Sequence, residues 1–107
     1  MVSANTYYLH ALSFDELWKH QHGRCLYCDR FMVREGNPRA ARHVTREHVF
    51  PRSLGLPVAC IALACAECNN AKGCRMPTTD EANRFLAVYE RAAKILPRFA
   101  LPMECVA

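Results

Sequence analysis

The hydrophobic pattern predicts one helix near each end of the chain. Apolar residues repeat at helical spacing over about 14–22 and again, for a longer stretch, over about 79–96. In the second segment the apolar positions are Ala82, Phe85, Leu86, Tyr89, Ala92, Ala93 and Leu96. Each segment opens with a capping box, in which Ser13 or Thr78 is followed three residues later by a glutamate. We therefore expect two packing helices that flank the middle of the chain.

The middle of the chain shows the pattern of a small sheet followed by a helix. Residues 42–50 are rich in β-forming side chains, Pro51 ends this run, and residues 51–57 are predicted to form a loop. The short apolar run 58–64 favours a buried strand over a helix, and a short helix should follow from Ala66 to Gly73. The expected fold class is therefore α+β, in a single domain over residues 1–107, because this length suits one domain.

Charge narrows the range of expected partners. The net charge is +4, and the stretch 24–52 alone carries this excess, with seven arginines against three acidic residues. Such clustering fits contact with a polyanion such as nucleic acid, and a solvated basic face is the alternative. No apolar run approaches the length of a membrane span, and the N-terminal residues lack the features of a secretory signal. We expect a cytoplasmic protein that makes no membrane contact.

Seven cysteines in 107 residues are a high density, and four of them form two Cys-x-x-Cys pairs. The spacing of Cys25 with Cys28, and of Cys65 with Cys68, lets two thiolates reach one ion. Together the pairs can complete a closed, tetrahedral structural zinc site, and in a reducing compartment clustered cysteines more often bind metal than form disulfides. A redox pair or buried core cysteines are the alternatives, and Cys74 is the nearest competing ligand.

Two further motifs accompany the cysteine pairs. Residues 47–52 read Glu-His-Val-Phe-Pro-Arg, and residues 68–73 read Cys-Asn-Asn-Ala-Lys-Gly. With the cysteine pairs, and in this order, the segment 25–73 resembles the HNH endonuclease family, the ββα-metal nucleases, in its four-cysteine zinc-binding form. The resemblance implies a small ββα-metal core with a structural pair of zinc knuckles, flanked by the N- and C-terminal helices. It also implies metal-dependent hydrolysis of DNA, which leaves 5′-phosphate and 3′-hydroxyl ends.

The resemblance assigns a role to each of the polar residues in these motifs. It implies that His48 is the general base and that Glu47 and Asn69 hold one catalytic divalent ion, Mg²⁺ or Mn²⁺, in addition to the structural Zn²⁺. The chemistry agrees, because a neutral imidazole is a suitable base near pH 7 and Mg²⁺ prefers oxygen ligands. Double-stranded DNA is the expected partner. The residues expected to meet its phosphates are Arg46, Arg52 and Lys72.

The chain departs from the family's pattern at two positions. Glu47 stands where Asp is more usual, and Cys60 stands where the family keeps an asparagine that helps to hold the histidine loop. Cysteine is a weak hydrogen-bond donor, which favours the alternative of a catalytically silent zinc module that binds DNA or a protein partner. Asn70 is the alternative to Asn69 as an ion ligand. Because adjacent strand residues point to opposite faces, Glu47 and His48 can share a site only where the strand bends.

Two aromatic residues near the first cysteine pair complete the expectations. Tyr27 and Phe31 should pack around the first zinc knuckle, with stacking on a nucleic-acid base as the alternative. A chain of this length leaves little room for a separate recognition domain, so we expect targeting through a partner protein or a homodimer. A redox or zinc-storage role would leave the Glu47–His48 pair and the Asn-x-x-Lys-Gly run unexplained.

Overall fold

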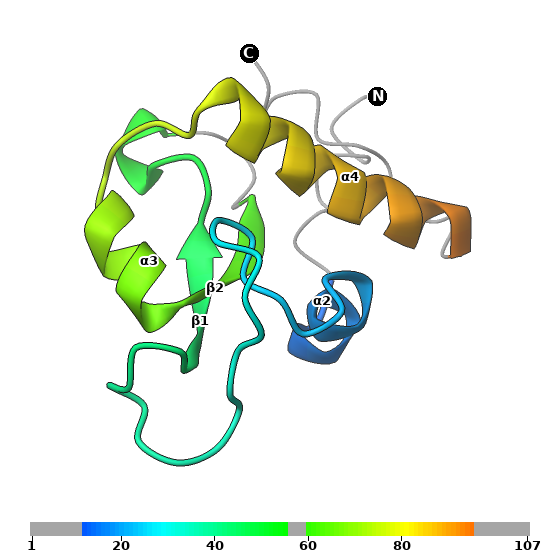
Figure 1. The fold of residues 1–107 in the computed structure, drawn as a ribbon. Helices are drawn as coiled ribbons and strands as arrows, with labels where there is room; N and C mark the ends of the chain where they lie inside the picture. Colours follow the sequence, from blue (N-terminus) through cyan, green and yellow to red (C-terminus); the bar gives the residue numbers. More distant parts are fainter. Residues whose placement is uncertain (1–11, 56–59, 96–107) are drawn as a thin grey trace.

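Two strands from the middle of the chain pair into an antiparallel hairpin (Figure 1). The computed structural model describes residues 12–55 and 60–95. β1 covers Val44–His48 and β2 covers Ile61–Cys65, with Val44 opposite Cys65 and His48 opposite Ile61. After β1 the chain turns at Pro51 into a short 3-10 turn, η2, at Arg52–Leu54. The end of β1 therefore lies beside a tight turn rather than in the middle of a sheet.

Three α-helices accompany the hairpin within the described residues. They are α2 (Phe14–His20), α3 (Ala66–Lys72) and α4 (Thr79–Ile95). Both predicted capping boxes are present, because the Ser13 and Thr78 hydroxyls accept from the backbone N–H groups of Glu16 and Glu81 at 3.1 Å. These bonds satisfy donors that the first helical turn leaves without partners. None of the helices in this part of the chain is long and apolar enough to cross a bilayer.

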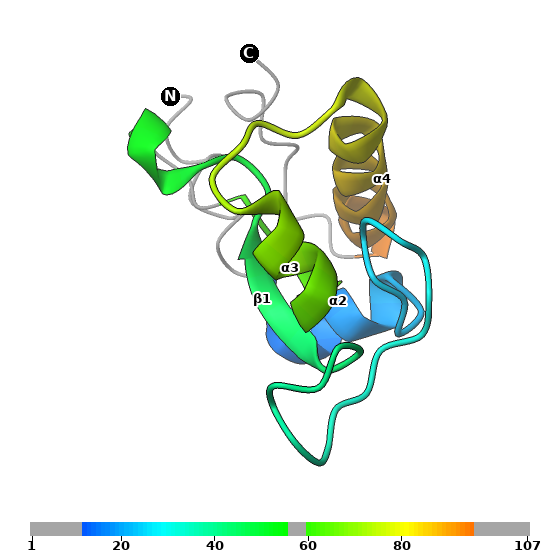
Figure 2. The ribbon, with the colours of Figure 1, turned by 60° about the vertical axis from the view of Figure 1, so that its left-hand side comes forward.

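One hydrophobic core joins the hairpin to the helices. α3 lies across β1 (Figure 2), while α2 contacts both β2 and α4. Phe85 and Tyr89 of α4 are buried with ring centroids 4.8 Å apart, and they belong to the same cluster as Leu17 of α2 and Leu63 of β2. The hairpin is thus fixed from the side of α2 and α4, and α3 is held against β1.

The α+β fold class is confirmed, and the element boundaries shift by a few residues. The strand predicted over 42–50 is limited to Val44–His48, and the helix predicted over 14–22 ends at His20. The helix ends early because His22 and Gly23 adopt left-handed backbone angles, with φ of 57° and 69°. Positions 58 and 59 of the second predicted strand, and position 96 of the last helix, lie outside the described residues.

Candidate metal centre and the adjoining polar cavity

The four cysteines of the two Cys-x-x-Cys pairs converge at one point. Cys25 and Cys28 lie in the turns after α2, and Cys65 and Cys68 lie at the junction of β2 and α3. Their sulfur atoms all lie within 4.8 Å of one another, and those of Cys28 and Cys65 are 3.9 Å apart. Sulfur ligands of one tetrahedral Zn²⁺ at about 2.3 Å would be roughly 3.8 Å apart. The four-cysteine cluster is therefore consistent with a structural Zn²⁺.

Donors surround the sulfur atoms of the cluster. The backbone N–H groups of Tyr27 and Cys65 each donate to Cys25 Sγ at 3.3 Å. Arg42 Nη1 lies 3.3 Å from Cys28 Sγ and 3.4 Å from Cys65 Sγ. Thiolates bound to a divalent ion keep excess negative charge, and these donors stabilise that charge. The surroundings of the cluster thus match its proposed ligand role.

The environment acts differently on the individual thiols. Burial raises the pKa of Cys25, and burial together with neighbouring thiols raises the pKa of Cys68. Burial also tends to raise the pKa of Cys28, but a hydrogen bond from the backbone of Arg30 and bonds with neighbouring thiols lower that pKa to about 7. A bound cation would favour the thiolate form throughout the cluster. Cys74, the nearest competing ligand in sequence, is exposed and lies outside the cluster.

A cavity of about 230 Å³, lined mainly by polar and charged residues, opens where β1 ends. Its lining comes from the end of β1, the η2 turn, and α3 with the residues that follow it. The lining residues are Arg46, Glu47, His48, Pro51, Arg52, Ser53, Asn69, Gly73 and Cys74. The cavity therefore brings together all but one of the residues predicted to act in catalysis or nucleic-acid contact, and the exception is Lys72.

Glu47 and His48 reach this cavity although they are neighbours on a strand. Glu47 is 3% exposed, while His48 is half-buried and pairs with Ile61 as the last residue of β1. The cavity extends to Pro51 and Arg52 and so wraps around the end of the strand. It can take side chains from both faces of β1 for that reason. Because the chain changes direction at the end of β1, Glu47 and His48 can both face this cavity.

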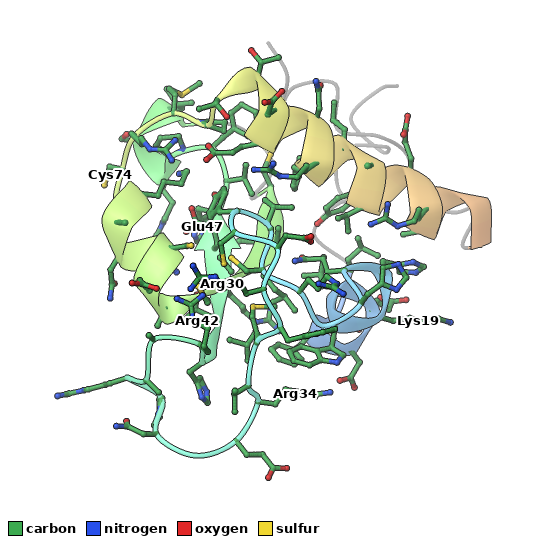
Figure 3. All side chains as sticks on the ribbon, viewed as in Figure 1. Lys19, Arg30, Arg34, Arg42, Glu47 and Cys74 are labelled. Carbon is green, nitrogen blue, oxygen red and sulfur yellow. The ribbon has the colours of Figure 1, made fainter. Side chains whose placement is uncertain are left out.

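The Glu47 carboxylate is held in place by two partners. The Tyr27 hydroxyl donates to Oε2 at 2.7 Å, and Lys72 Nζ lies 3.1 Å from the same atom. Burial, followed by the bond to Glu47, raises the pKa of Tyr27, so the phenol stays protonated and remains a donor. Figure 3 shows Glu47 near the centre of the molecule. Among the described residues, Oε1 of Glu47 has no hydrogen-bond partner.

Lys72 has an internal partner in this structure. It is 4% exposed, and its Nζ contacts both the Glu47 carboxylate and, at 3.4 Å, the backbone oxygen of His48. A buried carboxylate requires such a partner, because an uncompensated charge in the interior is strongly unfavourable. The expected contact between Lys72 and a phosphate stays a prediction, and its ammonium points into the protein.

His48 lies between opposing electrostatic influences. Burial is the largest effect that lowers its pKa from the ordinary histidine value, and the positive charge of Arg52 acts in the same direction. The Glu47 carboxylate acts the other way, and Lys72 adds a further lowering effect. The ring is therefore neutral near pH 7 and able to accept a proton. Arg46 and Arg52 are both exposed at the cavity.

Asn69 and Asn70 differ in their position relative to the cavity. The Asn69 side chain donates through Nδ2 to Thr45 Oγ1 at 2.8 Å and to the backbone oxygen of Arg46 at 3.4 Å. Both bonds use the nitrogen, which leaves the amide oxygen of Asn69 as the remaining acceptor. Asn70 is exposed and is not part of the cavity wall. The geometry favours Asn69 over Asn70 as an oxygen ligand.

Cys60 lies directly behind the loop that follows His48. It is completely buried, its φ is 53°, and its backbone oxygen accepts from Val49 N–H at 3.1 Å. The residue at this position thus contacts the histidine loop through its backbone. A cysteine side chain is a weaker hydrogen-bond donor than the asparagine that the resemblance places at this position.

The two aromatic residues of the first cysteine pair behave differently from each other. Tyr27 is half-buried and contacts Glu47, in accord with packing around the knuckle. The same expectation for Phe31 is wrong, because its side chain is 62% exposed. The Arg24 guanidinium lies over the Phe31 ring, 4.1 Å from the ring centroid. The chain after Cys28 turns outward through Asp29, whose φ is 62°, and so presents Phe31 to solvent.

Some structural partners of the site have no signal in the sequence. The buried Gln21 amide bonds both the N–H and the carbonyl of Leu63 at 2.8 Å, and so fixes β2 to the end of α2. The bond between Tyr27 and Glu47 is of the same kind, since it joins residues from separate elements. Isolated polar residues of this kind show no periodicity, and their partners are defined only by the fold.

The known proteins provide no assignment for this fold and site. No model of a protein family matches the chain, and no curated protein and no solved structure matches it significantly. The four-cysteine cluster and the α+β hairpin fold therefore stand on the structure itself.

Proposed function

We propose that the protein is a metal-dependent endonuclease of the HNH type, which hydrolyses phosphodiester bonds in DNA. The observation that carries the proposal is the cavity at the end of β1, where Glu47, His48 and Asn69 line one space of about 230 Å³. A base and two oxygen ligands in one cavity suit water-dependent cleavage of a phosphodiester. The order of the cysteine pairs and polar motifs along residues 25–73 adds the resemblance to the HNH family.

His48 acts as the general base in the proposed reaction. A ring nitrogen of His48 takes a proton from a water molecule as the water oxygen forms a bond to phosphorus. The bond from phosphorus to the 3′ oxygen breaks, and that oxygen takes up a proton from a solvent water molecule to become the 3′-hydroxyl. Burial and the charge of Arg52 lower the pKa of His48, which favours the neutral ring that a base requires. Arg46 and Arg52 contact the phosphate as planar donors.

Two residues would hold the divalent ion, Mg²⁺ or Mn²⁺. Glu47 offers a carboxylate oxygen and Asn69 an amide oxygen, and two protein ligands suffice for Mg²⁺, which keeps several waters. When bound, such an ion supplies positive charge to the scissile phosphate and to the leaving oxygen. Tyr27 and Lys72 fix the orientation of Glu47. A structural Zn²⁺ on the four cysteines would fix the start of α3 and hence Asn69.

A catalytically silent zinc module that binds DNA or a protein partner is the second candidate. The ion pair between Glu47 and Lys72 favours it, because a carboxylate that is already neutralised by an ammonium attracts a cation less strongly. Cys60 in place of the family's asparagine points the same way. Salt-sensitive DNA binding without cleavage in any divalent metal would decide for this second function.

A cleavage assay across divalent metals tests the proposal. Zinc-loaded protein is incubated with duplex DNA, single-stranded DNA and RNA in the presence of Mg²⁺, Mn²⁺ or neither ion. We expect cleavage of duplex DNA that depends on the added ion. Asn69→Ala should slow it at least about tenfold, because it removes an ion ligand. The neighbouring, exposed Asn70→Ala is the matched control and should cleave like the wild type. Equal rates for the two variants would contradict the ligand assignment.

A further inference from the structure

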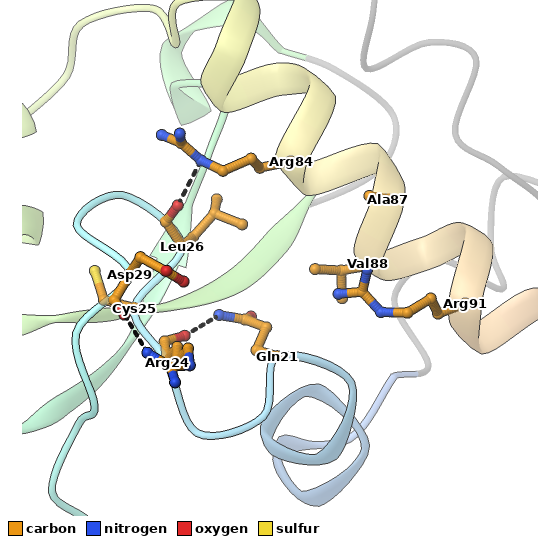
Figure 4. Close-up of a pocket in the computed structure, with 9 residues that line it drawn as sticks. All are labelled: Gln21, Arg24, Cys25, Leu26, Asp29, Arg84, Ala87, Val88 and Arg91. Carbon is orange, nitrogen blue, oxygen red and sulfur yellow. Dashed lines mark hydrogen bonds between the residues drawn. The ribbon is translucent and has the colours of Figure 1, made fainter.

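A second cavity lies away from the proposed catalytic cavity, between the end of α2, the first cysteine pair and α4 (Figure 4). It has a volume of about 200 Å³ and shares no lining residue with the cavity at the end of β1. Three arginines line it, Arg24 from the turn after α2 and Arg84 and Arg91 from α4. The lining contains one acidic residue, Asp29. The cavity is therefore positively charged on balance.

Backbone carbonyls hold the three guanidinium groups in place. Arg24 Nη1 donates to the backbone oxygen of Asp29 at 3.1 Å, and Arg84 Nε donates to that of Leu26 at 2.9 Å. Arg91 Nη2 donates to the backbone oxygen of His20 at 2.6 Å. In the described part of the chain, none of the three forms an ion pair with a carboxylate. Carbonyls orient these cations without neutralising them, so their charge remains available to an anionic ligand.

An exposed aromatic ring adjoins the same cavity. The Arg24 guanidinium lies 4.1 Å from the centroid of the Phe31 ring, and Phe31 is 62% exposed. Arg24 thus belongs to both the cavity wall and the aromatic stack. Cationic grooves with an exposed aromatic ring suit nucleic-acid strands, because phosphates meet the cations and a base can stack on the ring. An acidic peptide would use the cations and would have no base to place on Phe31.

We propose that Arg24, Phe31, Arg84 and Arg91 form a second nucleic-acid-binding surface, which holds the phosphates of an unpaired strand and stacks one of its bases on Phe31. This Arg24 surface, as we name the four residues, goes beyond the proposed nuclease function. It does not depend on cleavage at His48. The fold creates it, because Arg84 and Arg91 come from a segment with no net excess of positive charge and meet Arg24 only after α4 packs on α2.

Fluorescence polarisation with labelled oligonucleotides tests the Arg24 surface. Zinc-loaded protein is titrated with a single strand and with a duplex of the same length, without Mg²⁺ or Mn²⁺, so that binding is measured independently of cleavage. Arg84→Gln and Arg91→Gln should each weaken single-strand binding about fivefold and reduce its salt dependence by about one counterion. Phe31→Ala should weaken single-strand binding at least about fivefold and affect the duplex far less, because only an unpaired base can stack on it.

Arg39→Gln is the matched control for charge. Arg39 is exposed on the loop before β1, outside both cavities, and its removal subtracts the same unit charge. It should change the affinity less than about twofold. Thermal unfolding and zinc content show whether each variant is folded. If an arginine variant does not fold, Phe31→Ala still tests the proposal. Equal losses of affinity in Arg84→Gln, Arg91→Gln and Arg39→Gln would overturn the proposal. Unchanged affinity in Phe31→Ala would do the same, as would competition by polyglutamate that is as strong as competition by the oligonucleotide.

Discussion

The four-cysteine cluster and the polar cavity at the end of β1 share the junction of β2 and α3, where Cys68 and Asn69 are adjacent. At the cluster, four sulfur atoms converge within 4.8 Å and could complete the ligand set of one tetrahedral ion. At the cavity, the side chains of Glu47 and Asn69, which we propose as ion ligands, border an open space, and Glu47 already has Tyr27 and Lys72 as partners. A closed ligand set suits a permanent structural ion, whereas an incomplete one leaves room for water and substrate.

The same elements couple the two regions. Tyr27 lies between the first two cysteines of the cluster and donates to Glu47 at 2.7 Å. Asn69 directly follows the last cysteine of the cluster and lines the cavity. Any ion that fixes the four cysteines therefore also fixes one partner and one candidate ligand of the cavity. We therefore expect that damage to the cluster disturbs the cavity, while damage to the cavity leaves the cluster intact.

Loss of a cluster ligand should have the largest effect. Cys65→Ser removes a buried ligand, and a small domain that relies on a structural metal loses much of its folding free energy with it. We expect a drop in Tm of at least about 15 °C in thermal unfolding, which corresponds to ~3 kcal/mol or more in a domain of this size. Cys74→Ser, at an exposed cysteine outside the cluster, is the control and should leave both Tm and zinc content unchanged.

Removal of the Lys72 ammonium should destabilise the cavity side of the molecule. Lys72→Met leaves the buried Glu47 carboxylate without its cationic partner, which we expect to lower the free energy of unfolding by about 3 kcal/mol. Denaturation in urea measures the change, and zinc content should stay at the wild-type level. Lys19→Met, at an exposed lysine of α2, is the control. If both variants are equally stable, the Glu47–Lys72 pair does not contribute as described.

A smaller effect is expected from Tyr27→Phe, which tests the coupling between the regions. The variant keeps the ring and loses the hydroxyl that orients Glu47, so it should raise the Mg²⁺ or Mn²⁺ concentration needed for half-maximal cleavage about tenfold. Its zinc content should not change. A metal dependence identical to that of the wild type would show that the Tyr27 hydroxyl does not influence metal binding at the cavity.

The smallest effect concerns the pH dependence of cleavage. Because burial and the charge of Arg52 lower the pKa of His48, the rate should rise with pH and reach its plateau earlier than for an ordinary histidine. Arg52→Gln removes positive charge, raises the pKa of His48 and so moves the rising limb to higher pH. Arg39→Gln should leave the limb in place. A limb that stays fixed in Arg52→Gln, or moves to lower pH, would contradict the electrostatic account.

Local patterns predicted a large part of the fold. Capping boxes and apolar spacing specify α2 and α4 because both signals depend on residues within a few positions of each other. The cysteine spacing likewise predicted the cluster, and several residues of the motifs at 47–52 and 68–73 line one cavity, while their roles stay predictions. The helix predictions succeeded because their signals are local, whereas the cluster was predicted because its two separate pairs have the spacing that one tetrahedral ion requires.

Predictions that needed distant partners were less complete. Lys72 was assigned to a phosphate, yet the fold places its ammonium on Glu47, a partner from another element. The Arg24 surface depends on the packing of α4 against the first cysteine pair, and the exposure of Phe31 depends on a left-handed turn at Asp29. Side-chain partners of this kind follow from tertiary packing, which one-dimensional periodicity does not encode.

We propose that the cavity, and not the cluster, carries the chemistry. Nicking of supercoiled plasmid by His48→Ala, with zinc content measured in the same preparation, tests it most directly. We expect one zinc per chain and a rate at least about 100-fold below the wild type in Mg²⁺ or Mn²⁺. His22→Asn is the control, because His22 is exposed and asparagine tolerates its left-handed backbone angles. This variant should nick like the wild type. Wild-type nicking by zinc-loaded His48→Ala would contradict the claim.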